Sequence, residues 1–319
     1  MNRELEAHCR IVARRLRAGD VVPFLGAGVN LCGRPSGVDW RSGPYLPSGG
    51  ELATYLADNY AYPPRERRDL LRVSQYVQAV TGRTALYEEL RNLLAGDYRP
   101  TALHRLLAEL PRQLRTWRAE GSLSRHQLIV TTNYDDALEQ AFQEAEEPFD
   151  LVTYVARGEH RGKFLHRHPS GDVTLIEQPN AYRRLSLEER TVILKIHGAV
   201  DREDAERDSY VITEDNYIEY LAQTDISNLI PASLMAVMNE SHFLFIGYSL
   251  GDWNLRVILH RIWGAQPFEE KFKSWAIQKK PSELEEELWR DRNVVILDAD
   301  LGDYVDVFRS VALDGAAGA

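Results

Sequence analysis

Short apolar segments that alternate with amphipathic helical patterns constrain the fold of this 319-residue chain more than any other feature. Strand-like apolar segments lie at 21–25, 127–132, 151–155, 191–196, 210–213, 242–248, 273–277 and 293–297. Helical spacing of apolar residues lies at 3–18, 135–146, 227–240, 253–263 and 282–290. Strands that are apolar along their length are typical of a parallel sheet covered on both faces, and right-handed connections then place helices on each side. The sequence therefore predicts an α/β fold with a doubly wound parallel sheet.

The region between the first two predicted strands has helical patterning only. Residues 33–50 are rich in Gly, Pro and Ser, which indicates a loop. Ser48 and Glu51 then have the spacing of a capping box at the start of a helix. Helical spacing of leucines continues to about residue 110, so we expect an all-helical insert over 35–120.

The rest of the chain fits a single domain. Residues 156–190 read as an irregular excursion rich in Arg, His and Pro, and a solvated loop is the preferred interpretation of His160, His166 and His168 there. We expect one unit over 1–319, with its core at 18–34 and 121–300, the insert at 35–120, and a C-terminal helix and tail at 301–319.

Composition and charge exclude several classes of protein. Lys plus Arg number 38 and Asp plus Glu number 48, so the formal net charge is −10, and an acidic surface repels nucleic-acid backbones. Two cysteines, Cys9 and Cys32, cannot build a four-cysteine zinc site or a disulfide framework, which fits a reducing cytoplasm. No apolar segment approaches the ~18 residues that span a bilayer. We expect a cytoplasmic protein without membrane contact, metal ion or direct nucleic-acid binding.

Four polar segments each follow a predicted strand, where open α/β sheets bind their ligands. The first contains Gly26 and Gly28, whose spacing allows a tight turn and a close backbone approach to a diphosphate, with amide donors from a following helix. Leu31 replaces the third glycine of the complete dinucleotide-binding pattern. A simple turn at the end of the strand is the alternative interpretation.

The second and third segments carry an amide, a carboxylate and an imidazole. After the strand at 127–132, Asn133 offers a donor and an acceptor and Asp135 can accept from a pair of hydroxyls, although either residue could instead cap the next helix. After the strand at 191–196, His197 could present its imidazole to a cleft as a general base. A histidine satisfied within a turn is the alternative there.

The fourth segment follows the strand at 242–248 and contains Gly247, Ser249 and Asp252. Ser249 and the turn amides could hold a ribose or phosphate, and Asp252 could accept from ribose hydroxyls, or the segment could be a plain capped turn. The Gly-x-Ser-x-Gly pattern here also fits a hydrolase elbow, but only His260 follows it, inside the next predicted helix, which disfavours a serine hydrolase. The sequence has no phosphate-binding loop of the Gly-Lys-Ser/Thr type.

The order of these motifs, G-A-G-V-N, T-T-N-Y-D, K-I-H-G and G-Y-S-L-G-D-W-N, resembles the sirtuin-like (silent information regulator) superfamily, most closely its bacterial branch of NAD+-consuming antiphage effectors. The resemblance covers the core segments 18–34 and 121–300 and implies a Rossmann-like fold. It implies that Asn133 and His197 are catalytic, that Asn133 positions a water or a ribose hydroxyl, and that His197 acts as the base. The residues that it implies for NAD+ binding are Gly26, Ala27, Gly28, Asn30, Thr132, Asp135, Gly247, Ser249 and Asp252.

The sequence departs from the protein-deacylating sirtuins in two places. No cysteine follows His197, so the four-cysteine zinc module of deacylases is missing, and Asn30 stands where deacylases usually carry serine. The helical insert at 35–120 also resembles what the NAD+-cleaving branch carries. The resemblance thus implies an NAD+ glycohydrolase, the toxic effector of an abortive-infection system, which takes NAD+ as substrate and uses no metal.

The resemblance also implies how such an enzyme is controlled. Uncontrolled NAD+ hydrolysis would kill the host cell, so we expect activation by assembly into a homo-oligomer or by a partner, such as a HerA-type ATPase/helicase or another defence-system subunit. The alternatives are an NAD-dependent protein deacylase and a non-catalytic NAD-binding subunit of a larger complex.

Overall fold

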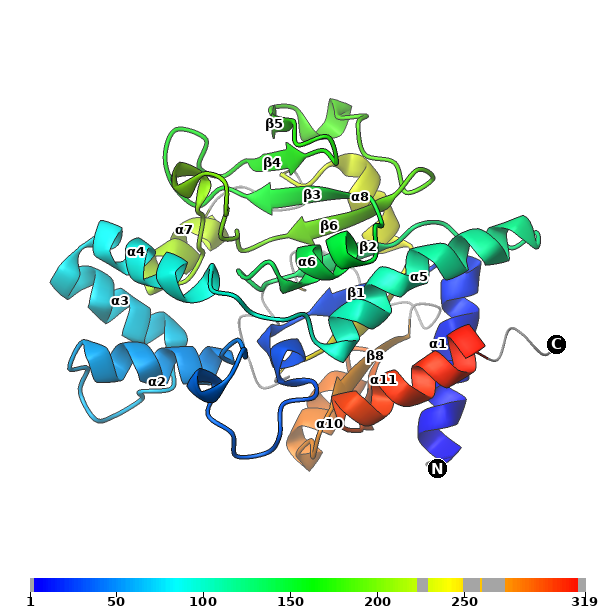
Figure 1. Ribbon diagram of the computed structural model, residues 1–319, viewed down its shortest axis with the longest axis horizontal. Coiled ribbons are helices and arrows are strands. Elements are labelled where there is room, and N and C mark those ends of the chain that lie inside the picture. The colour runs from blue at the N-terminus through cyan, green and yellow to red at the C-terminus, as the bar shows by residue number, and fades with distance from the viewer. Residues whose placement is uncertain (1–2, 223–228, 249–258, 260–272, 315–319) are drawn as a thin grey trace.

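The computed structural model describes residues 3–222, 229–248, 259 and 273–314 of the chain (Figure 1). These residues contain a nine-stranded sheet in the order β5-β4-β3-β6-β2-β1-β7-β8-β9. Its strands are β1 Val21–Leu25, β2 Leu128–Thr131, β3 Phe149–Tyr154, β4 Phe164–Arg167, β5 Val173–Ile176, β6 Thr191–Lys195, β7 His242–Ile246, β8 Ser274–Gln278 and β9 Val294–Asp298. Neighbouring strands are parallel throughout the part of the sheet that runs from β3 to β9. At the other edge, β4 pairs antiparallel with both β3 and β5.

Helices cover both faces of the sheet, as the apolar strands predicted. Alternate residues of β1 enter different clusters: Val22 and Phe24 pack on one face, and Val21 and Leu25 on the other. The side seen in Figure 1 carries α1 Arg3–Ala18, α5 Ala102–Ala119, α6 Ala137–Glu144 and α11 Leu301–Arg309. The opposite side carries residues of α7 Glu214–Ala222, α8 Ala232–Asn239 and α10 Glu283–Arg290. The doubly wound α/β fold is therefore confirmed.

The helical insert forms a small unit of its own beside the sheet (Figure 1). It consists of α2 Gly49–Asn59, α3 Leu70–Thr81 and α4 Arg83–Leu94, which share an apolar cluster with Tyr210 and Ile212 from the segment after β6. The predicted capping box starts α2, since Ser48 and Glu51 each accept a hydrogen bond from the other's backbone N–H, at 3.4 and 2.8 Å. The insert is shorter than the expected 35–120, because the leucines of α5 pack with α1, α6 and α11 against the sheet.

Two predictions for the connecting segments are wrong. Residues 210–213 form no strand, because Val211 packs on the sheet cluster while Tyr210 and Ile212 pack on the insert, so tertiary packing accounts for their apolar character. The excursion at 156–190 contains the β4–β5 hairpin, and His166 is buried in it. The ring of His166 lies 2.9 Å from Asp150 Oδ1 and 2.7 Å from Tyr182 Oη, so this histidine belongs to a buried network and not to a solvated loop.

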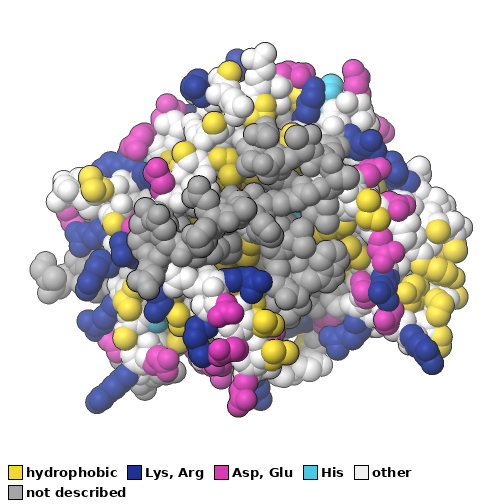
Figure 2. Space-filling view, turned by 180° about the vertical axis from the view of Figure 1, so that it is seen from behind, with side chains coloured by type: hydrophobic (Ala, Val, Ile, Leu, Met, Phe, Trp, Pro, Cys, Tyr) yellow, Lys and Arg dark blue, Asp and Glu magenta, His cyan; other side chains and the backbone are white. Residues whose placement is uncertain are grey.

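Helix limits differ from the sequence prediction on the C-terminal side of β6. Helix α8 begins at Ala232 and not at 227, directly after Pro231. Helix α7 was not predicted, and the expected helix at 253–263 and the tail at 315–319 lie outside the described residues, apart from residue 259. None of the helices in the described ranges is long and apolar enough to cross a membrane. On the face seen from behind, side chains of both charges intermingle around the described surface (Figure 2).

Candidate active site

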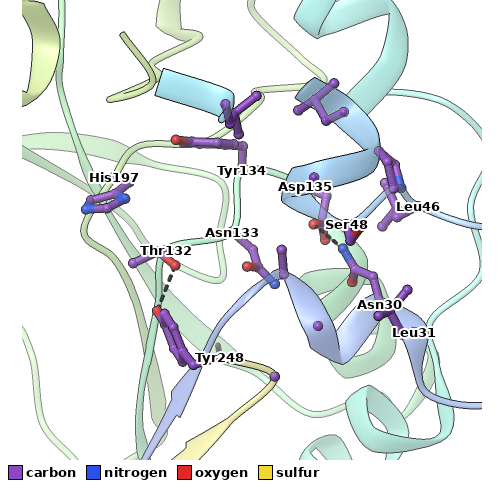
Figure 3. A pocket seen from close by; sticks show the side chains of 18 of the residues that line it. Asn30, Leu31, Leu46, Ser48, Thr132, Asn133, Tyr134, Asp135, His197 and Tyr248 are labelled. Carbon is purple, nitrogen blue, oxygen red and sulfur yellow. Dashed lines mark hydrogen bonds between the residues drawn. The ribbon is translucent and has the colours of Figure 1, made fainter. Parts of the chain in front are cut away.

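A cavity of about 1150 Å³ lies at the carboxyl ends of the central strands (Figure 3). Its volume is slightly above the range of about 300–1,000 Å³ that is common for small-molecule sites, so a dinucleotide is within its capacity. Residues after β1, β2, β6 and β7 line it, and the loop before α2 with parts of α2 and α3 closes its other side. The sequence-predicted residues among its lining are Ala27, Gly28, Asn30, Thr132, Asn133, Asp135, His197 and Gly247.

Glycines allow the loops after β1 and β7 to touch each other through their backbones. Gly28 N donates to the carbonyl of Gly247 at 2.8 Å, and a Cβ on Gly28 would lie 2.6 Å from that oxygen. Gly247 has a φ of +75°, and a Cβ there would lie 2.4 Å from Val29 N. Only glycine fits at these two positions. Ser249 and Asp252, which follow in the same segment, lie outside the described residues.

The chain after Gly26 differs from the expected helix with free amides. A short 3-10 helix, Ala27–Leu31, follows β1. Its Gly28 amide is bonded to Gly247, and its Val29 amide donates to the carbonyl of Gly26 at 3.1 Å. These two amides are therefore used within the protein. The glycine spacing therefore serves the close packing of the loops after β1 and β7, and not the start of a helix with free backbone amides.

Asn133 is held by one backbone contact and one side-chain contact. Its backbone N–H donates to Thr131 Oγ1 at 3.0 Å, and its Nδ2 donates to the carbonyl of Gly26 at 3.3 Å. Its Oδ1 is buried and has no hydrogen-bond partner among the described residues. Asp136, not Asn133, occupies the cap position of α6, so the capping interpretation of Asn133 is excluded. The Asn133 oxygen is therefore an acceptor without a donor, on a side chain that lines the cavity.

Asp135 is held beside the first loop. Its Oδ2 accepts from Asn30 Nδ2 at 3.1 Å, a contact drawn in Figure 3, and its Oδ1 accepts from the backbone N–H of Ala137 at 3.2 Å. Both Asn30 and Asp135 are buried, and Asn30 Oδ1 has no partner in the described part of the chain. The carboxylate thus joins the loops after β1 and β2, and its bond to Ala137 also caps α6 in part.

His197 is buried against two tyrosines of α7. Its Nδ1 lies 3.2 Å from the hydroxyl of Tyr217, and the rings of Tyr217 and Tyr220 meet it edge-on at 5.2 and 5.6 Å. The Nε2 atom is buried without a partner in the described ranges. Burial lowers the pKa of His197 from 6.5 to about 3, so the imidazole is neutral at pH 7. When the Tyr217 hydroxyl accepts the Nδ1–H, the lone pair on Nε2 is left for a proton.

A hydrogen bond between two further side chains lies between the amide and the imidazole in the view of Figure 3. Thr132 Oγ1 and Tyr248 Oη are 2.7 Å apart. Tyr248 also packs on Phe24, with ring centroids 5.5 Å apart. This pair bridges the ends of β2 and β7 inside the cavity. Tyr248 stood within the fourth motif, but nothing in its residue type marked it as part of the lining.

The sequence interpretation also missed residues that come from other elements. Tyr217 reaches the site from the unpredicted helix α7, and Ser48, Arg68 and Leu71 line the cavity from the insert region. An amphipathic pattern shows that a helix packs somewhere, but not against which loop. Within the described ranges, no group of three or more His, Cys, Asp or Glu side chains has the arrangement of a metal site.

Comparisons with known proteins match this geometry to a family and to two relatives. The family described as SIR2-like domain matches residues 127–297, more than half of the chain. The chain is 25% identical over 293 residues to "Defense-associated sirtuin 2" of Bacillus subtilis, a match that covers 89% of this chain and 23% of that protein. It is 27% identical over 253 residues to "NAD(+) hydrolase ThsA" of Acinetobacter baumannii (strain 532279), covering 79% of this chain and 41% of that protein. The chain therefore spans less than half the length of either relative.

Proposed function

This chain belongs to the family of SIR2-like domains, and we propose that it is an NAD+ glycohydrolase that cleaves NAD+ into nicotinamide and ADP-ribose. One observation carries the proposal: Asn133 Oδ1 and His197 Nε2 are both buried, both lack a partner among the described residues, and both belong to side chains that line one cavity. A buried polar atom without a partner is costly, so a ligand that supplies the missing donors is favoured. The name of the Acinetobacter relative, an NAD(+) hydrolase, supports the same substrate.

The reaction breaks the bond between nicotinamide and the ribose carbon. Nicotinamide leaves as a neutral molecule with the electron pair, through an oxocarbenium-like state, and the oxygen of a water then bonds to the same carbon. Asn133 Oδ1 accepts a hydrogen bond from that water or from a ribose hydroxyl and so orients it. His197 Nε2 takes the proton that the water loses and later passes it to solvent.

The environment of His197 suits this role in one respect. Because burial keeps the imidazole neutral at pH 7, its Nε2 lone pair is unprotonated and can accept a hydrogen bond from the attacking water. The loops after β1 and β7, with Gly28 and Gly247, present backbone to the cavity, where a diphosphate can approach closely, whereas Gly26, which the sequence also suggested, does not line the cavity. We assign Ala27, Asn30, Thr132 and Asp135 to the NAD+-binding wall of the same cavity.

We further propose a role in antiphage defence. The name of the Bacillus relative, a defense-associated sirtuin, supports this role. An NAD+ hydrolase that is always active depletes its own cell, so we propose that the enzyme is inactive until a homo-oligomer forms or a partner binds. A HerA-type ATPase/helicase or another defence-system subunit is the kind of partner that we propose.

The test is to incubate the purified protein with NAD+, alone and with an acetylated peptide, and to identify the products. Nicotinamide and ADP-ribose should form without peptide. Asn133→Ala and His197→Ala should each lower turnover by about 100-fold or more. The matched controls Asn180→Ala and His160→Ala remove the same groups from exposed positions and should turn over at the wild-type rate. If Asn133→Ala releases nicotinamide as fast as the wild type, the assignment is wrong, and release that depends on the peptide would identify a deacylase.

A further inference from the structure

Lys195 is a buried cation next to the candidate site, and the proposed reaction does not use it. It is the last residue of β6, two positions before His197, and its side chain is 1% exposed. Its ammonium donates to Glu139 Oε1 at 2.6 Å and to the backbone carbonyl of Asp135. Lys195 therefore connects the end of β6 with the first turn of α6 and with the loop that follows β2.

The side chain does not reach the substrate side of that loop. Lys195 is not among the residues that line the cavity, whereas Asn133, Tyr134 and Asp135 are. The ammonium thus contacts the loop from behind. Any influence on the reaction passes through the loop backbone, so Lys195 is not a candidate general acid or base.

The contact adds to backbone bonds between the same two segments. Val200 N donates to the carbonyl of Tyr134 at 2.8 Å, and Ile196 N donates to the carbonyl of Thr131 at 3.1 Å. Together with the Lys195 contact, the segment that carries His197 thus donates to three backbone carbonyls, one before Asn133 in the chain and two after it. The Lys195 contact is the charged one of the three, and charge-assisted hydrogen bonds are the stronger kind.

Stability alone does not require a charge at this position. Burying an ammonium and a carboxylate is costly, and a buried ion pair can often be replaced by neutral side chains of similar size without loss of stability. Removing one partner, by contrast, leaves an unpaired buried charge. Burial raises the pKa of Glu139, and the charge of Lys195 opposes that rise. A well-packed neutral side chain would lack one thing that the Lys195 ammonium provides, which is a hydrogen bond to the Asp135 carbonyl.

We propose that Lys195 is a positioning residue, which fixes the 132–136 loop against the end of β6 and so sets the place of Asn133 relative to His197. As far as it concerns turnover, the proposal rests on the proposed NAD+ hydrolysis. Its structural part, the hold on the loop, is independent of the reaction.

The test compares three variants with the wild type. Lys195→Met and Glu139→Met each leave one buried charge unpaired and are expected to melt at lower temperature. The double variant K195M/E139M removes both charges and adds no N–H donor, so we expect it to restore the fold while the Asp135 carbonyl still lacks its donor. Asp150→Asn is the matched control, because Asp150 is 1% exposed and paired with His166 and Arg190, away from the 132–136 loop.

Two measurements decide the outcome. Amide hydrogen exchange of the 132–136 segment should be about tenfold or more faster in the double variant than in the wild type, and unchanged in Asp150→Asn. For nicotinamide release, kcat should fall by about tenfold or more while KM changes little, since the reacting groups are misplaced and most of the cavity is intact. Unchanged exchange in the folded double variant overturns the hold on the loop. Faster exchange with unchanged kcat overturns the positioning role. A wild type that releases no nicotinamide in any assembly refutes the proposed function instead, and the exchange result still decides the hold on the loop.

Discussion

Replacing Gly247 with alanine tests the contact between the loops after β1 and β7, which forms part of the cavity wall. Gly247 has a φ of +75°, and for an L-residue this left-handed conformation costs about 1–2 kcal/mol. The added Cβ would also lie 2.4 Å from Val29 N and 2.8 Å from the Gly28 carbonyl carbon, both backbone atoms. Forcing a methyl group into a filled position costs about 1–3 kcal/mol more. We expect Gly247→Ala to lose about 2–5 kcal/mol of unfolding free energy.

The matched control for this prediction is Gly33→Ala. Gly33 has a φ of +80°, and a Cβ there would meet no atom within 4 Å, so only the conformational part of the cost remains. The assay is urea unfolding followed by circular dichroism, with the midpoint and slope compared for the two variants and the wild type. If Gly247→Ala loses no more unfolding free energy than Gly33→Ala, the loops after β1 and β7 are not in close backbone contact.

Three further predictions concern the neighbourhood of the same cavity. The pKa of His197 is about 3 in the folded chain and about 6.5 in the unfolded one, so the unfolded state binds more protons between these two pH values. The contribution of His197 to stability is therefore complete above pH 6.5 and decreases as the pH is lowered. At pH 5 the loss from this group is about 2 kcal/mol. Urea midpoints at pH 7.5 and 5 should therefore differ more for the wild type than for His197→Gln, and an equal pH dependence would contradict the buried neutral imidazole. Gly198→Ala places a Cβ 2.2 Å from the Ser209 carbonyl at a φ of +86° and should lower the melting temperature more than Gly33→Ala, whereas equal melting would show that the turn after β6 is open. Thr132→Val and Tyr248→Phe remove the same hydrogen bond, so their double-mutant cycle should give a coupling of about 0.5–1.5 kcal/mol, and strictly additive losses would mean that the bond is not formed.

The fold class could be predicted from local pattern because each central strand is buried on both faces. A strand such as β6, Thr191–Lys195, is buried at every position, and its three central residues are consecutive apolar residues. The segment 210–213 shows the limit of that argument. It is similarly apolar, but its side chains divide between the sheet and the insert, and it pairs with none of the strands that the structure describes. The pattern of apolar residues in a sequence indicates that a segment is buried, but it does not indicate which element the segment packs against.

The strands β4 and β5 at one edge of the sheet were not predicted from the sequence, for a related reason. The two strands of the β4–β5 hairpin are only four residues long, and β4 alternates between buried and partly buried residues, with His166 among the buried ones. His166 is buried there only because Asp150 from β3 and Tyr182 from the following loop satisfy both of its nitrogens. A polar side chain can be buried when distant residues supply its partners, and the sequence around it carries no sign of them.

The candidate site divides in the same way. By itself, the sequence determined which residue types end the strands, because glycines, Asn133, Asp135 and His197 follow directly on apolar segments, and parallel strands bring their carboxyl ends to one edge. Only the tertiary structure decided what those residues can do. It uses the Gly28 amide in a contact with Gly247, buries His197 behind Tyr217, and places Lys195 beneath the Asp135 carbonyl. Burial and hydrogen-bond partners set the chemistry of a side chain, and both come from residues that are far away in the chain.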